Sequence, residues 1–368
     1  MLAVIRRPLS LCTALLLACA THVSAWASTW PPVPALSAHR GASALKPEHT
    51  QAAFEQAMQD GADILELDVV LSQDGVLVVR HDNALAALNA DGSVKFATTN
   101  IAQHPEFATR KTTKMVDGAS LTGWFTEDFT WAELQSLRAT ERFATLRPAS
   151  AALDGQLPLM TLQQVATLIQ AHNATAARPV GLFIEIKHAA HAKALGLDMV
   201  KAMVDFLNHN QWSHAESPVL VKSFEVQVLQ DLRGHSAVRI VQLLSNQNGP
   251  PDLAAQGVTY AQMGTAQGMA DIRQYAQGVS LLRHLAADMD KGQWVRASAV
   301  MREAKDAGLS VHIWTLRPEN QFLPNPYKNG SNPAQRGNAQ AEARALLAIG
   351  ADGLITDDPA SIRAAFGR

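Results

Sequence analysis

The stretch Ile64–Asp82, ILELDVVLSQDGVLVVRHD, decides the fold because it places two carboxylates inside one apolar strand. Glu66 and Asp68 stand two residues apart, so both side chains point to the same face of that strand. A turn at residues 73–75 then folds the chain into a short hairpin that ends at His81. A buried strand whose end carries ionisable residues is typical of a parallel barrel, in which the strand ends surround the active site.

Short apolar runs that alternate with helical patterns continue along the whole chain. Eight such runs are expected as strands: Leu36–His39, Ile64–Val70, Gly181–Lys187, Val219–Phe224, Arg239–Leu244, Gly278–Leu282, Ser310–Leu316 and Gly353–Thr356. The clearest helical patterns cover Thr50–Gln59, Thr161–His172, Ala192–Asn208, Ala297–Ala307, Ala341–Ile349 and Ala360–Phe366. Alternation of strands and helices predicts a parallel sheet, and eight strands are the number that closes a (β/α)₈ TIM barrel.

Two connections are longer than a barrel needs. Residues 83–158 form a long insertion after the second strand, and residues 317–336 form a loop rich in Pro, Asn and Gly. Long loops of this fold lie over the C-terminal face of the barrel, where ligands bind. We therefore expect one barrel domain over residues 28–368 that contains the insertion, and both long connections are candidates for substrate selection.

The N-terminus has the pattern of an export signal. Two arginines precede an apolar run, Leu9–Ala20, that is too short to span a bilayer, and a small-x-small cleavage site ends at Ala27. Cleavage of a signal peptide over residues 1–27 predicts a periplasmic or secreted protein. Because Cys12 and Cys19 both lie in this segment, the mature chain would form no disulfide and use no cysteine nucleophile. Lipoprotein anchoring at Cys19 is the alternative, ranked below soluble export.

Composition indicates a globular enzyme with no global charge field. Hydrophobic residues make up 47% and charged residues 17% of the 368 residues, and 31 Lys and Arg stand against 33 Asp and Glu. This balance gives no reason to expect nucleic acid or an anionic membrane as a partner, and no later stretch is long and apolar enough for stable membrane insertion. Nothing in the sequence indicates an oligomeric state.

Ionisable residues recur at the ends of the first predicted strands. Each one alone has an ordinary explanation, since a Glu-x-Asp pair is usually a solvated edge and a lone His usually a core or surface residue. Together they favour a shared site. Glu66, Asp68 and Glu185 form an all-oxygen set that suits Ca²⁺ or Mg²⁺ better than zinc. Oxygen ligands indicate a hard metal ion but do not determine the size of the cavity that holds it. Both Ca²⁺ and Mg²⁺ therefore remain candidates, with Ca²⁺ expected ahead of Mg²⁺.

The other residues at these strand ends suit an anionic substrate. Arg40 and Lys187 would supply positive charge for a phosphate group, Arg through its planar fork and Lys as a point charge. His39 and His81 titrate near neutrality, so one can remove a proton while the other donates one.

At this point the sequence resembles the glycerophosphodiester phosphodiesterase family over about residues 37–359. The matching motifs are His39-Arg40-Gly41-Ala42, Pro47-Glu48-His49-Thr50, Glu66-Leu67-Asp68-Val69, Asp74-Gly75, His81-Asp82, Glu185-Ile186-Lys187, Lys222-Ser223-Phe224, His312-Ile313-Trp314-Thr315 and Ala351–Asp357. Within the insertion, Leu121–Phe125, Asp128–Thr130 and Glu133-Leu134 resemble the periplasmic branch of the family.

The resemblance implies a metal-dependent hydrolase that splits glycerophosphodiesters, such as glycerophosphocholine and glycerophosphoethanolamine, into sn-glycerol 3-phosphate and an alcohol. It gives the two histidines, the three carboxylates and the two cations the roles already assigned. It further puts Glu48 near the metal or just outside its ligands. The role of His49, which replaces the usual Asn, stays open, with a surface role expected ahead of catalysis. Phe224 and Trp314 would line the pocket against the glycerol carbons, with ordinary barrel packing as the equal alternative.

Two other classes of protein fit parts of the pattern. A phospholipase D-like or phosphatidylinositol lyase enzyme has the same barrel, but the chain lacks a basic or amphipathic membrane-binding segment. A binding protein that keeps the barrel without catalysis would lack a ligand or a histidine, and none is missing here.

Overall fold

The computed structural model describes residues 30–367. The predicted signal peptide, with Cys12 and Cys19, lies outside the described residues. Within residues 30–367, no helix combines the length and apolarity needed to cross a membrane.

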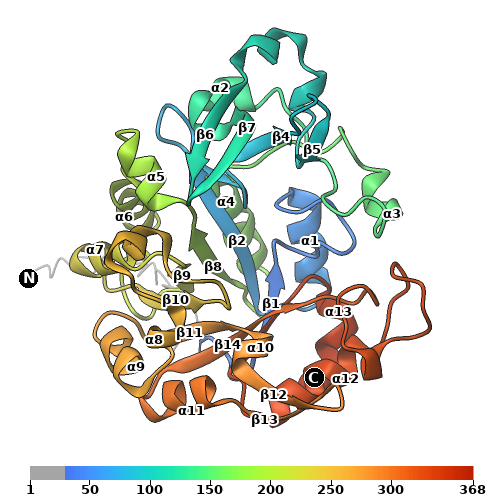
Figure 1. Ribbon diagram of the computed structural model, residues 1–368, viewed down its shortest axis with the longest axis vertical. Coiled ribbons are helices and arrows are strands. Elements are labelled where there is room, and N and C mark those ends of the chain that lie inside the picture. The colour runs from blue at the N-terminus through green and yellow to red at the C-terminus, as the bar shows by residue number, and fades with distance from the viewer. Residues whose placement is uncertain (1–29, 368) are drawn as a thin grey trace, which may run out of the picture.

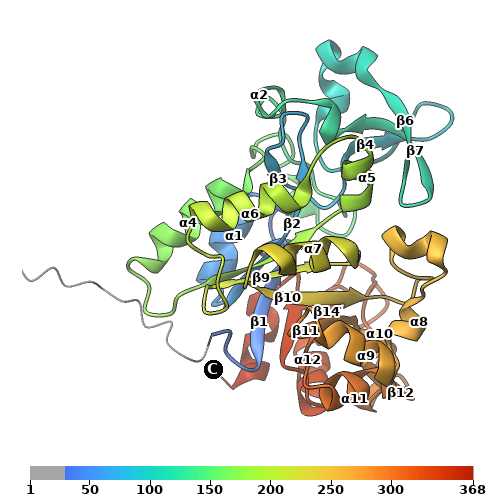
Figure 2. The same cartoon turned by 90° about the vertical axis from the view of Figure 1, so that its left-hand side faces the viewer.

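Eight parallel strands close into a barrel at the centre of the molecule (Figures 1 and 2). The strands are β1 (Ala35–His39), β2 (Ile64–Leu71), β8 (Gly181–Ile186), β9 (Val219–Ser223), β10 (Arg239–Leu244), β11 (Gly278–Leu282), β14 (Ser310–Leu316) and β15 (Gly353–Thr356). Strand β1 pairs with β15 on one side and with β2 on the other, which closes the ring. The predicted TIM barrel is confirmed, and all eight predicted strands are present within one residue at each end.

Alternation along the strands separates the barrel interior from the layer under the helices. Ile64 of β2 packs with Phe183 and Leu220 in a small interior cluster, whereas Leu65 and Leu67 belong to the large core beneath the helices. Because side chains alternate along a strand, the residues that follow Ile64 on its face are Glu66 and Asp68. The sequence pattern therefore carries both carboxylates into the barrel.

Helices pack around the outside of the barrel. They are α1 (Gln51–Gln59), α4 (Leu162–Asn173), α5 (Ala189–Ala194), α6 (Met199–His209), α7 (Gln227–His235), α8 (Tyr260–Met263), α9 (Ala266–Arg273), α10 (Arg283–Ala286), α11 (Ala299–Asp306), α12 (Ala339–Ala348) and α13 (Pro359–Ile362). Short 3₁₀ turns cover η4 (Pro251–Gln256), η5 (Asn325–Tyr327) and η6 (Arg363–Phe366). A two-stranded hairpin, β12 (Ala287–Asp290) and β13 (Gln293–Ala297), precedes α11.

Three predicted helices need correction. The helix expected over 192–208 is two helices, because Gly196 takes a positive φ of 80° and Asp198 begins the second by accepting a bond from the Lys201 N–H. The helix expected over 297–307 begins later, since residue 297 ends strand β13. The last helix expected, over 360–366, is a short α-helix followed by a 3₁₀ turn.

The insertion builds a small layer of its own at the C-terminal end of the barrel strands, at the top of Figure 1. After β3 (Leu77–Val79) pairs antiparallel with β2, four strands form a sheet in the order β5-β4-β7-β6. They are β4 (Ala84–Leu88), β5 (Val94–Ala97), β6 (Thr112–Val116) and β7 (Ala119–Phe125), followed by α2 (Trp131–Leu134) and α3 (Pro148–Ala151). Three 3₁₀ turns, η1 (Ile101–Gln103), η2 (Pro105–Arg110) and η3 (Thr126–Asp128), complete the segment.

Candidate active site

The three predicted metal ligands meet at the mouth of the barrel. Side-chain oxygens of Glu66, Asp68 and Glu185 all lie within 4.8 Å of one another, and each residue is at most 5% exposed. Asp68 and Glu185 stand opposite each other in the β2–β8 register, which fixes their approach through the backbone. The i, i+2 spacing of the first two and the pairing of neighbouring strands together create this carboxylate triad.

The donor set fits a hard divalent cation. Glu66 Oε1 and Asp68 Oδ2 are both buried, which is costly for charged oxygens unless cations contact them, and only the side chains of Lys222, Arg40 and His49 lie beside them among the described residues. Burial, together with the neighbouring Asp68 and Glu185, raises the pKa of Glu66. The triad therefore offers oxygen ligands whose mutual repulsion a Ca²⁺ or Mg²⁺ ion would relieve.

Two lysines neutralise part of the triad. The Lys222 Nζ lies 2.8 Å from Glu66 Oε1 and 3.3 Å from Glu185 Oε2, and the Lys187 Nζ lies 2.8 Å from Glu185 Oε1. Lys187 was expected at the site, whereas Lys222 was recognised only as part of a motif. Lys222 lies near the C-terminal end of strand β9, where its buried ammonium group reaches two carboxylates of the triad.

Arg40 joins the triad to Glu48. It follows strand β1 with a positive φ of 58°, and its backbone N–H donates to Glu66 Oε2 at 2.9 Å. Its guanidinium contacts Asp68 Oδ2 at 3.3 Å and Glu48 Oε2 at 2.9 Å. Glu48 therefore does not contact the triad directly, and it binds Arg40, which does.

His39 is held by a buried carboxylate. Its Nδ1 lies 2.6 Å from Asp357 Oδ1, and because a carboxylate only accepts, Nδ1 carries the proton and Nε2 the lone pair. Burial, reinforced by Arg40 and Arg317, lowers the pKa of His39 to about 4, against the opposing effect of Asp357. The imidazole is therefore neutral near pH 7 and free to take a proton at Nε2.

His81 has the same arrangement on the other side of the mouth. Its Nδ1 donates to Asp82 Oδ1 at 2.9 Å, and its Nε2 accepts from the Lys187 Nζ at 3.1 Å. Burial, with help from Arg40 and Lys187, lowers the pKa of His81 to about 3. Both histidines thus use Nδ1 on a carboxylate and carry no proton on Nε2.

The surface role expected for His49 is wrong. The residue is only 4% exposed, and its Nε2 lies 3.1 Å from Asp68 Oδ2 and 3.2 Å from the Asp68 backbone nitrogen. Its backbone φ of 60° turns the side chain inward from the loop before α1. His49 thus supports a triad carboxylate.

Phe224 and Trp314 line a cavity beside the charged residues. The cavity measures about 900 Å³ and also contacts His81 and Lys187. The two aromatic rings meet edge to face with centroids 5.6 Å apart, and the Lys187 Nζ lies 5.5 Å from the Phe224 centroid. The aromatic pair therefore packs together and also forms a wall of the cavity.

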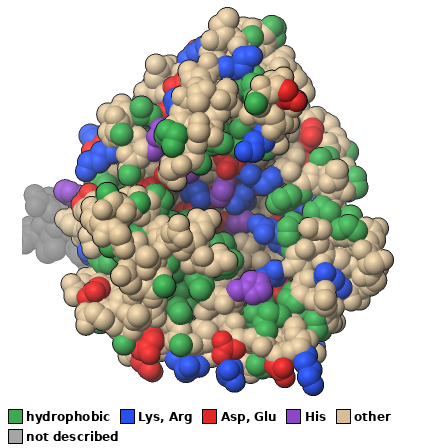
Figure 3. Space-filling view, viewed as in Figure 1, with side chains coloured by type: hydrophobic (Ala, Val, Ile, Leu, Met, Phe, Trp, Pro, Cys, Tyr) green, Lys and Arg blue, Asp and Glu red, His purple; other side chains and the backbone are tan. Residues whose placement is uncertain are grey.

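Figure 3 shows the site as a hollow below the insertion, in which Lys, Arg and His side chains gather. The ion pairs that join the triad to its neighbours hold five carboxylates and four cations: Glu48, Glu66, Asp68, Asp82 and Glu185 with Arg40, Arg142, Lys187 and Lys222. With neutral histidines this network has a net charge of −1. A divalent cation would bring it to +1, which favours a monoanionic ligand.

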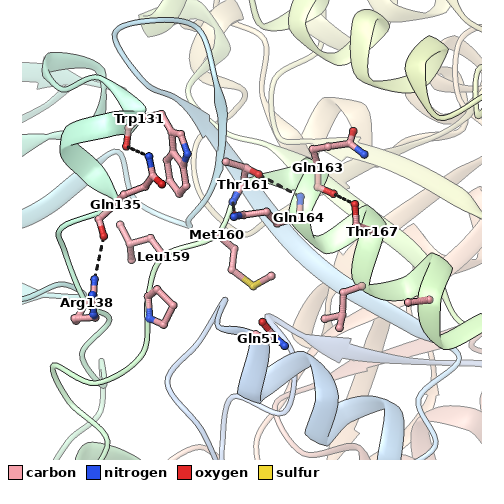
Figure 4. A pocket seen from close by; sticks show the side chains of 13 residues that line it. Gln51, Trp131, Gln135, Arg138, Leu159, Met160, Thr161, Gln163, Gln164 and Thr167 are labelled. Carbon is pink, nitrogen blue, oxygen red and sulfur yellow. Dashed lines mark hydrogen bonds between the residues drawn. The ribbon is translucent and has the colours of Figure 1, made fainter.

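A second groove lies outside the hollow, between the insertion and α4 (Figure 4). It measures about 590 Å³, and its one charged lining residue is Arg138, whose guanidinium donates to the carbonyls of Gln135, Ser136 and Leu137. Gln51, Trp131 and Gln164 from three separate elements complete its walls in the view of Figure 4. Without an acid, a base or a carboxylate, this groove carries no hydrolytic chemistry.

Sequence reasoning missed two arginines of the insertion that reach the site, Arg142 and Arg147. Arg142 binds both oxygens of Glu48 at 2.7 and 3.0 Å and Asp82 Oδ2 at 2.5 Å. Arg147 binds Asp357 Oδ2 at 2.5 Å. No periodicity marks either residue, because both follow the sheet of the insertion in an irregular segment.

A parallel barrel whose mouth gathers three carboxylates that could hold a metal ion, with two imidazoles beside them, is the arrangement expected of a phosphodiester-cleaving hydrolase of TIM-barrel fold. The family model of the glycerophosphoryl diester phosphodiesterase family matches residues 39–361. The chain therefore belongs to the glycerophosphoryl diester phosphodiesterases, and the expected family and enzyme class are confirmed.

Relatives from distant organisms agree with this assignment. The chain is 28% identical to glycerophosphodiester phosphodiesterase GDPD6 of Arabidopsis thaliana, over 88% of this chain and 84% of the relative. It is 26% identical to the glycerophosphodiester phosphodiesterase of Haemophilus influenzae, over 95% of this chain and 94% of the relative.

Solved structures support the fold. A Silicibacter pomeroyi protein assigned as a glycerophosphoryl diester phosphodiesterase superposes with a TM-score of 0.62 at 21% identity, over 91% of this chain and 93% of that one. An Oleispira antarctica phosphodiesterase, solved in complex with the product sn-glycerol-3-phosphate, gives 0.57 at 20% identity, over 91% and 98%.

Proposed function

We propose that this chain hydrolyses small glycerophosphodiesters, such as glycerophosphocholine and glycerophosphoethanolamine, to sn-glycerol 3-phosphate and a free alcohol. The observation that carries the proposal is the buried carboxylate triad flanked by two histidines whose Nε2 atoms are both unprotonated. The product complex of the Oleispira antarctica phosphodiesterase supports the choice of glycerol phosphate as the retained half.

The metal would be held by Glu66, Asp68 and Glu185, with Ca²⁺ expected ahead of Mg²⁺. Ca²⁺ accepts irregular sets of oxygen ligands, whereas Mg²⁺ demands near-ideal octahedral geometry, which rigid strand ends do not easily supply. When bound, the cation supplies charge neutralisation at the phosphate oxygens. Arg40 and Lys187 would hold the same phosphate group from the protein side, the first by its fork and the second as a point charge.

The two histidines would move the protons. One of His39 and His81 removes the proton from the substrate's own glycerol hydroxyl, whose oxygen then forms a bond to phosphorus. The bond from phosphorus to the outgoing alcohol breaks, and the second imidazole donates a proton to that oxygen. Water then opens the cyclic phosphate. A bound phosphodiester is an anion, so it raises the pKa of nearby imidazoles and helps the acid hold its proton.

Phe224 and Trp314 would pack against the glycerol carbons. They form one wall of the cavity that opens beside His81 and Lys187. Apolar carbons against aromatic faces orient the substrate without competing for its polar groups.

Export from the cytoplasm completes the proposal. The N-terminal pattern up to Ala27 supports cleavage of a signal peptide, and the motif at Leu121–Phe125 supports the periplasmic branch of the family. Lipidation of Cys19 is the alternative, and N-terminal sequencing of the exported protein would separate the two.

The decisive experiment measures glycerol 3-phosphate released from glycerophosphocholine by purified protein, with EDTA and after Ca²⁺ or Mg²⁺ is added back. Release that stops with chelator and returns with one ion supports both the reaction and the metal. His39→Ala and His81→Ala should each abolish turnover in a folded protein, and full turnover in both variants would remove the acid/base assignment. Release of a head group from phospholipid vesicles, without release from glycerophosphocholine, would instead support a lipid-directed enzyme.

A further inference from the structure

The two active-site histidines share one supporting arrangement that begins in the insertion. Each imidazole donates its Nδ1 proton to a carboxylate, His39 to Asp357 and His81 to Asp82. The second oxygen of each carboxylate accepts a bond of 2.5 Å from an arginine of the insertion, Arg147 for the first and Arg142 for the second. These arginines lie five positions apart in the chain, so one short segment reaches both sides of the site.

Arg147 is fixed from several directions. Its side chain is 4% exposed, and it binds Glu319 Oε1 at 2.7 Å and the Ser43 carbonyl at 2.8 Å as well as Asp357. Ser43 in turn donates its hydroxyl to the His39 carbonyl at 2.8 Å. The guanidinium therefore ties the insertion to the loops that follow β1, β14 and β15.

Arg142 makes the corresponding link on the other side. It binds Glu48 through both carboxylate oxygens, and Glu48 also accepts from Arg40. Its side chain is 19% exposed, so this support is nearer to solvent than that of Arg147. The Arg142 guanidinium thus fixes Asp82, which binds His81. Through Glu48 it also fixes the guanidinium of Arg40 beside the triad.

Physical chemistry gives these contacts a consequence for proton transfer. A carboxylate held by one oxygen on histidine can still rotate, whereas one held by both oxygens fixes the plane of the ring and the proton on Nδ1. An arginine bound to the same carboxylate also offsets part of its negative charge, which keeps the imidazole pKa from rising. The charged groups with the largest effects on the pKa of His39 are Arg40, Asp357 and Arg317, and Arg147 contacts Asp357.

We propose that the insertion is a positioning element for the acid/base pair, in which Arg147 orients His39 through Asp357 and Arg142 orients His81 through Asp82. This inference rests on the proposed acid/base roles of the histidines and adds to them. It assigns the insertion a part in turnover itself, beyond the part in substrate selection expected of a long loop.

The test compares kcat, KM and pH–rate profiles for Arg147→Gln, Arg147→Lys, Arg142→Gln and Asp357→Asn with glycerophosphocholine as substrate. Arg147→Gln should lower kcat by roughly 10- to 100-fold with KM changed by less than about 3-fold, since Arg317 still donates to Asp357. The part of the pH–rate profile that reports His39 should move up by about one pH unit, because only Arg317 then offsets the negative charge of Asp357. Arg147→Lys should restore part of the loss.

A matched control comes from the insertion itself. Arg110 pairs with Glu133 at 2.5 Å, far in the chain from either histidine, and Arg110→Gln should leave kcat and the pH profile unchanged. A double-mutant cycle tests the route of action. If Arg147 acts through Asp357, adding Arg147→Gln to Asp357→Asn lowers kcat little further, and independent multiplication of the two losses would overturn the proposal.

The outcomes separate this inference from the proposed function. Full turnover in His39→Ala removes the acid/base assignment itself. If His39→Ala is inactive but Arg147→Gln has the same kcat and pH profile as the Arg110→Gln control, only the positioning role is refuted. If Arg147→Gln fails to fold by circular dichroism, the more exposed Arg142→Gln decides, and an unchanged kcat and pH profile in that variant would refute the inference.

Discussion

Removal of the Lys222 ammonium group tests whether this lysine neutralises the same triad carboxylates that a bound metal ion would neutralise. The side chain is 3% exposed and its Nζ contacts two triad carboxylates, Glu66 at 2.8 Å and Glu185 at 3.3 Å. Lys222→Met keeps the length and apolar volume but removes this ammonium group from both carboxylates, of which Glu185 keeps Lys187 as a partner. Loss of one partner of a buried ion pair costs about 3–5 kcal/mol, because the remaining charge is uncompensated.

The assay is thermal unfolding with EDTA and with saturating Ca²⁺. For a domain of this size, about 3–5 kcal/mol corresponds to roughly 4–7 °C in Tm. In EDTA we expect Lys222→Met to melt lower than the parent protein by that amount. With Ca²⁺ the difference should fall by at least about half, because a bound cation compensates the same carboxylates and binds the variant more tightly.

Lys201→Met is the matched control. Lys201 pairs with Asp205 on the surface of α6, and its side chain is 71% exposed, so its removal should change Tm little in either condition. A Tm difference for Lys222→Met that stays constant or widens with Ca²⁺ would refute the reasoning, since Lys222 would then support the metal site rather than share its charge.

Three further predictions address the triad, the cavity and the core. Glu185→Gln should abolish Ca²⁺ binding by calorimetry and lower kcat/KM by roughly a thousandfold, as the loss of several kcal/mol at the phosphate requires; retained binding would contradict the triad. Trp314→Ala should raise KM for glycerophosphocholine by roughly 5- to 10-fold with a smaller change in kcat, and an unchanged KM would reduce this ring to packing. Burial lowers the pKa of His312 to about 4, so the unfolded chain binds the extra proton and stability falls by about 3 kcal/mol as pH drops from 6.5 to 4. His312→Leu should reduce this acid destabilisation in urea unfolding at pH 4.5 and 7.5, and equal pH dependence in both proteins would refute the assignment.

The barrel was predictable because its strands are buried on both faces and therefore read as apolar runs. The same logic found the triad, since the spacing of Glu66 and Asp68 fixes a common face without knowledge of the fold. The missed helix break had a signal in the sequence. Gly196 and Asp198 are residues that commonly end one helix and begin the next, but the apolar pattern on both sides concealed the boundary.

The remaining site residues could not be predicted because they depend on register and on an irregular segment. Asp357 reaches His39 only because β15 pairs beside β1, with Thr356 opposite Ala38. Arg147 reaches Asp357 across a separation of 210 residues, from a segment without periodic pattern. Neither the Asp357–His39 contact nor the Arg147–Asp357 contact can be predicted from the residues that surround it in the sequence.

The contact between His39 and Asp357 makes the proposed acid/base catalysis depend on completion of the barrel. His39 depends on Asp357, 318 positions away, and the two meet only when the last barrel strand closes against the first. Arg147 binds Asp357 only when the insertion has also folded over the mouth. A barrel that is still open therefore leaves His39 without the carboxylate that fixes its proton on Nδ1, and an unfolded insertion leaves the second oxygen of that carboxylate to Arg317 alone. The triad needs less, because Glu66, Asp68 and Glu185 lie on two adjacent strands. Metal binding should thus be possible in partly assembled states in which acid/base catalysis is not.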